Sequence, residues 1–297
     1  MLKPDFMFVH HRTSGFILKK VNRRETDQLL TIYTKDFGKL EILAKAIRKI
    51  SSKLKSGAEI FYLSEIEFIQ GKTRKTLTDA ILIEKFENLR KDLKRIKIAY
   101  KISEFLDNLI SGQEPDEKIW RLLLETFNKL NTRAAAKCGE ERMFFEYKIY
   151  YYFAWNLLLI LGYRPELYSC VLCQKKLVAG NLFFSAKEGG VICQKCFKEL
   201  KLGKSPHQIW RGGSQRDKSL FHPSLHSGKE ITAETVKILR IILKKDWALF
   251  SKLKIEKSNL KSLDTIINEY YSYTEASAEV EKKEFSSTTE SRTAGRR

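Results

Sequence analysis

Four cysteines in two closely spaced pairs constrain this chain more than any other feature. Cys170 and Cys173 form one Cys-x-x-Cys pair, and Cys193 and Cys196 form a second after 19 intervening residues. Each such turn directs two thiolates at one point, and two turns on a small hairpin complete a tetrahedron around zinc. Because four protein ligands leave no position for water, we expect one structural Zn²⁺ per chain. A redox-active pair is the alternative, but the βαβ pattern that normally carries that motif is missing.

The remaining cysteine and the apolar runs exclude several classes of protein. Cys138 has no partner in the sequence, so five cysteines in 297 residues do not fit a small disulfide-bonded secreted domain. The longest apolar run, residues 149–161, is too short to cross a membrane and is expected to form a buried helix. The first residues do not read as a signal peptide. We therefore expect a soluble intracellular protein with no membrane partner.

The hydrophobic period changes once along the chain. Before about residue 85 the apolar residues alternate, as in Leu40, Ile42 and Ala44 after the turn signal at residues 36–38. Five short strands in about 75 residues favour a closed OB-fold barrel, with an open five-stranded sheet as the alternative. Beyond Glu87 the apolar residues recur every three or four positions, which predicts helices, among them 140–161, 233–250 and 259–273.

These patterns predict an α+β multidomain protein. We expect an N-terminal five-stranded OB-fold barrel, an α-helical bundle and a zinc finger inserted into the bundle. The tail is rich in Ser, Thr and charged residues, which is typical of disorder. The expected parts are the barrel at 1–85, the first part of the helical domain at 86–168, the finger at 169–202, a loop and the helices that complete the domain at 203–273, and the tail at 274–297.

The charge of the chain points to a polyanionic partner. Lys and Arg number 55 against 36 Asp and Glu, which gives a formal charge of +19. Such a surface attracts nucleic acid or an acidic membrane face. No catalytic signature is present: the sequence Gly203-Lys204-Ser205 lacks the glycine that a phosphate loop needs at position 198, which is Lys198. We therefore expect a binding protein and not an enzyme.

Basic residues cluster where loops of the predicted barrel lie. One cluster lies between Glu41 and Glu59 with no acid inside it, and a second surrounds Arg74 in the next hairpin. OB barrels hold single strands in a basic groove with aromatic side chains that stack on bases. Tyr33 and Phe37 are candidates for stacking, with packing in the barrel as the alternative. Other basic stretches are the helix at residues 90–97 and the finger. The candidate DNA-binding residues of the first cluster are Lys45, Arg48, Lys49, Lys53 and Lys55.

Several segments together resemble one bacterial family, the RecO recombination mediators. The resemblance covers about residues 13–250, and the segments follow the family's order and spacing. They are GFIL at 15–18, ETDQLLTIYT at 25–34, GKLEILAK at 38–45, LGYRPEL at 161–167, and GGVIC at 189–193 with the cysteine pairs. The chain departs from the family pattern at Ala46, Gln174 and Phe197, where glycine is common.

The resemblance implies an OB-fold, a helical domain and a zinc finger, as the residues themselves indicate. It implies a protein that binds single- and double-stranded DNA, anneals complementary strands and acts with RecR. Together they would help RecA replace single-strand-binding protein on DNA, without catalysing a reaction. It also carries the family's DNA contacts to Lys39, Lys45 and Arg48 and the neighbouring basic positions, and it implies a cytoplasmic, nucleoid-associated location.

Two other functions fit the same residues. OB barrels and zinc ribbons also occur in RNA-binding proteins, so an RNA-binding module is one alternative. The other is an interaction scaffold, in which zinc and charge serve the structure and docking of protein partners is the whole function. Competition between matched RNA and DNA strands distinguishes the first, and reversal of the basic cluster distinguishes the second.

Overall fold

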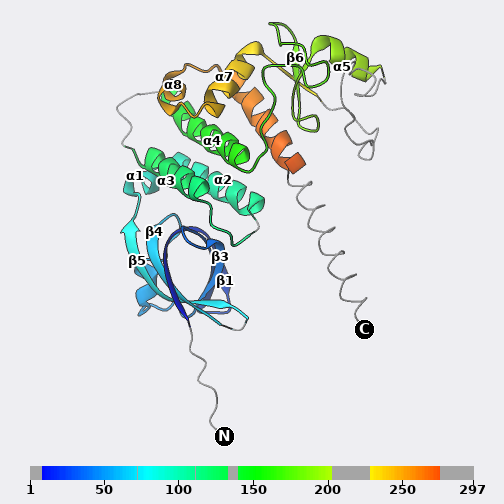
Figure 1. Ribbon diagram of the computed structural model, residues 1–297. Coiled ribbons are helices and arrows are strands. Elements are labelled where there is room, and N and C mark those ends of the chain that lie inside the picture. Colours follow the sequence, from blue (N-terminus) through cyan, green and yellow to red (C-terminus); the bar gives the residue numbers. More distant parts are fainter. Residues whose placement is uncertain (1–8, 72, 111, 133–139, 203–227, 275–297) are drawn as a thin grey trace, which may run out of the picture. The chain divides into compact units, whose positions relative to one another are not determined.

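The computed structural model describes residues 9–71, 73–110, 112–132, 140–202 and 228–274, shown in colour in Figure 1. The chain forms two compact units, Met1–Phe153 and Ala154–Arg297, and each has a hydrophobic cluster of its own. The boundary between them falls within the long helix α4 (Glu140–Ile160). Cys138 and most of the predicted tail lie outside the described residues. The five-part division predicted from the sequence stays a prediction.

The first unit begins with a closed five-stranded barrel, which confirms the prediction over the open sheet. Its strands are β1 (His10–Arg23), β2 (Asp27–Thr34), β3 (Gly38–Ala44), β4 (Leu63–Gln70) and β5 (Lys75–Glu84). They follow the order β1-β2-β3-β5-β4, and the barrel closes through antiparallel pairing of β1 with β4. The β3–β5 contact is parallel and short, with Ile42 beside Lys75 and Leu43 beside Thr76. This is the strand order of an OB-fold.

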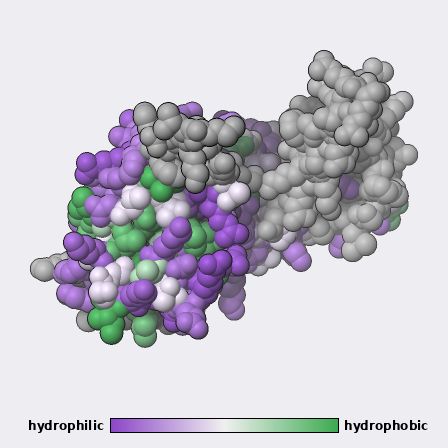
Figure 2. All heavy atoms as spheres, turned by 90° about the horizontal axis from the view of Figure 1, so that it is seen from below, coloured by the Kyte–Doolittle hydropathy of each residue, from purple (hydrophilic) through white to green (hydrophobic). Residues whose placement is uncertain are grey.

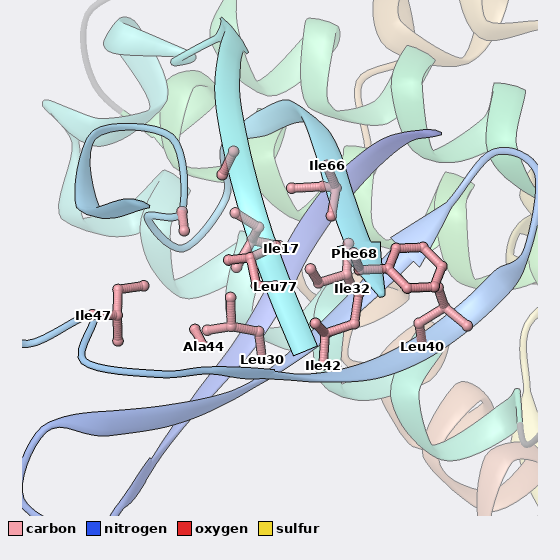
Figure 3. Packing of buried hydrophobic residues seen from close by; sticks show 12 residues of the cluster. Ile17, Leu30, Ile32, Leu40, Ile42, Ala44, Ile47, Ile66, Phe68 and Leu77 are labelled. Atoms are coloured by element: carbon pink, nitrogen blue, oxygen red, sulfur yellow. The ribbon is translucent and has the colours of Figure 1, made fainter. Parts of the chain in front are cut away.

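The alternating apolar residues fill the barrel. Figure 3 shows their side chains directed from the strands into one interior cluster. The connection between β3 and β4 adds Ile47 and Ala58, which are buried with the strand residues and close the cluster. Burial of this set is the main stabilising contribution to the barrel. Its members are Ile17, Leu30, Ile32, Leu40, Ile42, Ala44, Ile47, Ala58, Ile66, Phe68, Leu77 and Ala80.

Helices cover the barrel within the first unit (Figure 1). They are α1 (Glu87–Arg90), α2 (Leu93–Leu109) and α3 (Glu117–Asn131), and the start of α4 packs on α2. Asp92 and Asp116 cap α2 and α3 by accepting hydrogen bonds from backbone amides of the first turn. Aromatic side chains join the helices to β1 and its neighbours, namely Phe16, Phe61, Phe86, Trp120 and Phe127.

The basic stretch at residues 90–97 is not one solvated face. Arg95 is only 4% exposed, and its Nη1 donates to the carbonyls of Leu130 and Thr132, each at 2.8 Å, at the end of α3. Its Nε lies 3.8 Å from a carboxylate oxygen of Glu146, which is also buried. Arg90 donates to the Ile60 carbonyl at 2.6 Å and lies over the Tyr62 ring. Both arginines therefore hold the fold together.

We expect Arg95→Ala to destabilise the first unit by about 3 kcal/mol, because it removes the buried guanidinium that lies beside the Glu146 carboxylate and donates to two helix-end carbonyls. Urea unfolding of the full chain, with hydrogen exchange of α2 and α3, measures this effect. The exposed neighbour provides the control: Lys94→Ala should change stability by less than about 0.5 kcal/mol. Equal effects of the two substitutions would contradict a structural role for Arg95.

The second unit contains the rest of α4, a small sheet and further helices. The sheet has the order β7-β6-β8, from β6 (Leu182–Ser185), β7 (Gly190–Cys193) and β8 (Lys229–Ile231). Helix α5 (Gln194–Lys201) follows β7, and a last helix covers residues 257–274. The rings of Trp155, Phe184 and Tyr270 pack together in this unit. The hairpin of β6 and β7 was predicted from the sequence, whereas β8 was not.

The single helix predicted over 233–250 is wrong. The structure has two helices there, α7 (Ala233–Leu243) and α8 (Trp247–Lys252). Lys245 takes a left-handed backbone conformation, with φ of 60°, and this ends the helical path. Asp246 then caps α8 by accepting the Leu249 amide at 2.9 Å. The apolar period continues across this break, which is why the sequence suggested one helix.

Candidate nucleic-acid interface and metal centre

Seven exposed cations lie on two connected loops of the barrel. Several positions of the connection from β3 to β4 are buried or half-buried, whereas its basic residues face solvent. Ile47 anchors this loop in the barrel interior, so the residues beside it in sequence are directed outward. The loop from β1 to β2 supplies two more cations. We call this set the basic loop surface: Arg23, Arg24, Lys45, Arg48, Lys49, Lys53 and Lys55.

Hydrogen bonds fix the two loops against each other. The Arg48 backbone amide donates to the Thr26 carbonyl at 3.0 Å, and its guanidinium donates to the Glu25 carbonyl at 2.9 Å. The Ala46 amide donates to the Asp27 carboxylate at 2.8 Å. Ala46 has a φ of 52°, the left-handed region that explains why glycine is common at this position. The turn thus forms here without glycine.

The Asp27 carboxylate has a lowered pKa, because it accepts the backbone hydrogen bond from Ala46, is hydrogen-bonded by Thr26 and lies near the charges of Arg24 and Lys45; partial burial opposes this. A carboxyl with a lowered folded pKa stabilises the fold above its unfolded pKa of about 3.9. This stabilisation disappears as the pH falls through the folded pKa.

Consequently, the wild-type chain should lose more stability between about pH 5 and pH 2 than Asp27→Asn does. The asparagine side chain can still accept from Ala46, but it does not titrate. Urea midpoints measured across this pH range test the expectation. Parallel pH profiles for the two proteins would show that Asp27 contributes no pH-dependent stability.

Five of the predicted basic residues belong to the basic loop surface. Lys45, Arg48, Lys49, Lys53 and Lys55 are all exposed, and the bonds of Arg48 hold their loop against the turn that follows Arg23 and Arg24. The sequence analysis missed these two residues, which lie at the end of β1 and directly after it. Figure 2 shows the face of the molecule seen from the barrel side, where hydrophilic residues surround gathered apolar ones.

Arg74 belongs to a second place on the barrel. It is exposed in the connection from β4 to β5, and Lys72, two residues before it, lies outside the described residues. The following residue, Lys75, donates to the side-chain oxygen of Gln113 at 3.0 Å. The role of Arg74 in DNA binding stays a prediction.

Lys39 does not present a free ammonium group. Its Nζ donates to the Asp107 carbonyl and lies 3.1 Å from the carboxylate of the same residue. Lys19 contacts this carboxylate as well, at 3.4 Å. Lys39 therefore joins β3 to α2, and we remove it from the candidate DNA contacts.

The two aromatic candidates are packed in the protein. Tyr33 is fully buried, its hydroxyl donates to the Asp116 carbonyl at 3.5 Å, and burial raises its pKa to about 12. It cannot stack on a base in this arrangement, so that prediction is corrected. Phe37 is half-buried and meets the rings of His11 and Phe68 edge-on, which is packing at the barrel end.

The second unit brings the four predicted zinc ligands together. Cys170 and Cys173 lie in a turn before β6, Cys193 ends β7, and Cys196 lies in the first turn of α5. All four sulfur atoms lie within 4.8 Å of one another, and those of Cys173 and Cys193 are 3.9 Å apart. A zinc–sulfur bond of about 2.3 Å places the sulfurs of a tetrahedron about 3.8 Å apart. The cluster therefore fits Zn²⁺.

The local backbone also suits a metal-binding turn. The Cys193 amide donates to the Cys170 sulfur at 3.4 Å, and the Gln174 amide donates to the Cys170 carbonyl at 2.9 Å. Gln174 adopts the left-handed conformation, with φ of 59°, so the turn forms without the glycine common in the family. Burial raises the pKa of Cys170 and of Cys196, whereas backbone and thiol hydrogen bonds hold that of Cys173 below its usual value against the effect of burial. A bound cation would offset the cost of ionising the buried thiols.

Two family models together match most of this chain. The model described as Recombination protein O N terminal matches residues 7–86, and Recombination protein O C terminal matches residues 90–207. A relative from Dehalococcoides mccartyi, named DNA repair protein RecO, is 30% identical over 269 residues, which is 90% of each chain. The chain belongs to the RecO family. Its barrel is the OB-fold of that family, and membership assigns the chain a role in recombinational DNA repair.

Two further RecO relatives extend the comparison. The DNA repair protein RecO of Moorella thermoacetica is 33% identical over 189 residues, covering 62% of this chain and 66% of that protein. The one from Halalkalibacterium halodurans is 23% identical over 261 residues, or 88% of each chain. Among the residues that the structure describes, no helix combines the length and apolar character needed to span a membrane.

Proposed function

We propose that this RecO-family protein binds DNA on its basic loop surface and anneals complementary strands. We further propose that, with RecR, it helps RecA replace single-strand-binding protein in the bacterial cytoplasm and nucleoid, without catalysing a reaction. The observation that carries the proposal is the surface itself: seven exposed cations on two hydrogen-bonded loops of an OB barrel. No acid interrupts the chain between Glu41 and Glu59, Glu59 is paired with Lys20 at 3.1 Å, and the acids of the other loop are Glu25 and Asp27.

Phosphate neutralisation explains how such a surface promotes annealing. Cations that contact one strand release its counterions and reduce its repulsion for a complementary strand. The finger offers further exposed cations, Lys175, Lys176, Lys195, Lys198 and Lys201, in the second unit. Positive charge on both units supports simultaneous contact with more than one strand.

We also propose that the four-cysteine cluster holds one structural Zn²⁺. A closed four-thiolate site supplies folding free energy and no catalytic chemistry. Cys170 and Cys196 are buried among Leu172, Ile192, Phe197 and Leu200, a core too small to hold the finger by itself. The metal thus serves to stabilise the finger.

Annealing of complementary oligonucleotides precoated with single-strand-binding protein tests the proposed function. We expect the protein to accelerate duplex formation without ATP, and more strongly at about 50 mM than at about 200 mM salt. Tight DNA binding without acceleration would contradict the annealing role. Preference for RNA in a competition with a matched DNA strand would favour an RNA-binding module instead.

A further inference from the structure

The connection from β3 to β4 carries an isoleucine, Ile50, that is not packed in the protein interior. Ile50 is 100% exposed, the highest value among the large apolar residues of the described chain. Ile47, three residues earlier, is 2% exposed and fills the barrel. The loop is thus anchored by one isoleucine and presents the other entirely to solvent.

The backbone holds Ile50 at the corner of a closed turn. The Ser52 amide donates to the Lys49 carbonyl at 3.1 Å, which makes Ile50 and Ser51 the two central residues of a four-residue turn. A preceding turn is closed by the Lys49 amide, which donates to the Ala46 carbonyl at 3.1 Å. Such corners normally carry Gly, Pro, Asn, Asp or Ser, so turn geometry does not account for a β-branched apolar residue.

The surroundings of Ile50 are strongly basic. Exposed cations lie on both sides in the sequence, Arg48 and Lys49 before it and Lys53 and Lys55 after it, and no acid occurs between Glu41 and Glu59. An apolar tip within a basic surface suits a ligand with anionic and apolar parts. A nucleic-acid strand has both, in its phosphates and its base faces.

We propose that Ile50 inserts between neighbouring bases of the bound DNA strand and unstacks them, while the flanking cations hold the phosphates. Aliphatic side chains act in this way in proteins that bend or unstack DNA. Unstacked bases are free to meet a complementary strand, so the inference rests on the proposed annealing function and specifies how the strand is prepared.

A single strand that contains 2-aminopurine within an adenine run tests the inference, because this base fluoresces more strongly when it is unstacked. Wild-type protein should raise the fluorescence about twofold or more on binding, as expected for inserted side chains. Ile50→Ala should abolish most of the rise, and Ile50→Met should retain it. Ile83→Ala is the matched control, since Ile83 is also exposed but lies on β5, outside the connection from β3 to β4.

The salt dependence of DNA binding distinguishes failure of this inference from failure of the proposed function. Ile50→Ala should weaken binding by less than about tenfold and leave the slope of log K against log salt unchanged, because the phosphate contacts remain. A full fluorescence rise with Ile50→Ala, or none with the wild type despite a steep slope, would refute the insertion alone. A slope near zero for the wild type would refute DNA binding by the surface. Loss of RecR binding in Ile50→Ala with unchanged fluorescence would assign Ile50 to a protein contact and overturn the inference.

Discussion

Replacing Lys45, Arg48 and Lys49 together by Glu should weaken binding of single-stranded DNA by about 10²- to 10³-fold at about 150 mM salt. All three side chains are exposed on the same loop. If about five phosphates are neutralised, each contributes about −0.7 to the slope of log K against log salt, which gives a slope of about −3.5. With three contacts removed, the slope should fall in magnitude to about −1.4.

The substitutions should not unfold the barrel. The substitution removes the bond from the Arg48 guanidinium to the Glu25 carbonyl, but Ile47 and the bonds that the backbone amides of Ala46 and Arg48 donate still anchor the loop. Thermal melting of the triple variant checks that the barrel is intact. Binding is measured by fluorescence anisotropy at several salt concentrations.

A variant with the same charge change elsewhere is the control. Lys94, Lys97 and Lys118 are exposed on α2 and α3, and their replacement by Glu lowers the net charge equally. This control should bind DNA within about threefold of the wild type, since contact sites matter more than net charge at this salt concentration. If both variants lose binding equally, the basic loop surface is not the interface.

Removal of the metal should unfold the finger. Structural zinc contributes on the order of 10 kcal/mol to folding of small four-ligand domains. The cluster around Cys170 and Cys196 contains only a few buried side chains, so it cannot compensate for that loss. We expect about one equivalent of zinc per purified chain, and none after combined Cys170→Ser and Cys193→Ser substitution.

Hydrogen exchange identifies which elements unfold when the metal is lost. Protection of β6, β7 and α5 should disappear in the doubly substituted chain, whereas that of β1–β5 should remain, because the barrel belongs to the first unit. Cys138→Ser is the control and should retain the metal. A purified wild-type chain without metal, and with the same protection of the finger, would show that the cysteine cluster is not a zinc site.

Sequence patterns predicted the barrel and the cysteine cluster for different physical reasons. A strand with one buried face must alternate, so the barrel strands were visible locally, and β3 shows this in Leu40, Ile42 and Ala44. A tetrahedral four-thiolate site is built from two short turns, so the spacing of the cysteines predicted the cluster. Both signals are local: the alternation lies within single strands, and each cysteine pair spans four residues.

Contacts between distant segments were not visible in this way. The sequence placed Lys39 among the DNA contacts, but Asp107 of α2 binds its ammonium. It offered Tyr33 as a stacking residue, but the start of α3 covers it. Arg95 belonged to a basic stretch, yet it is buried beside Glu146. In each case the partner lies more than 50 residues away.

By itself, the sequence determined the kinds of structure in this protein: an alternating barrel, helices, a four-thiolate cluster and a strongly basic composition. The tertiary structure alone decided which cations remain exposed, and it joined the turn after Arg23 and Arg24 to the loop of Arg48. The physical reason is that period and spacing record which face of an element is buried. They do not indicate which other element packs on that face. This packing determines which charged side chains remain exposed.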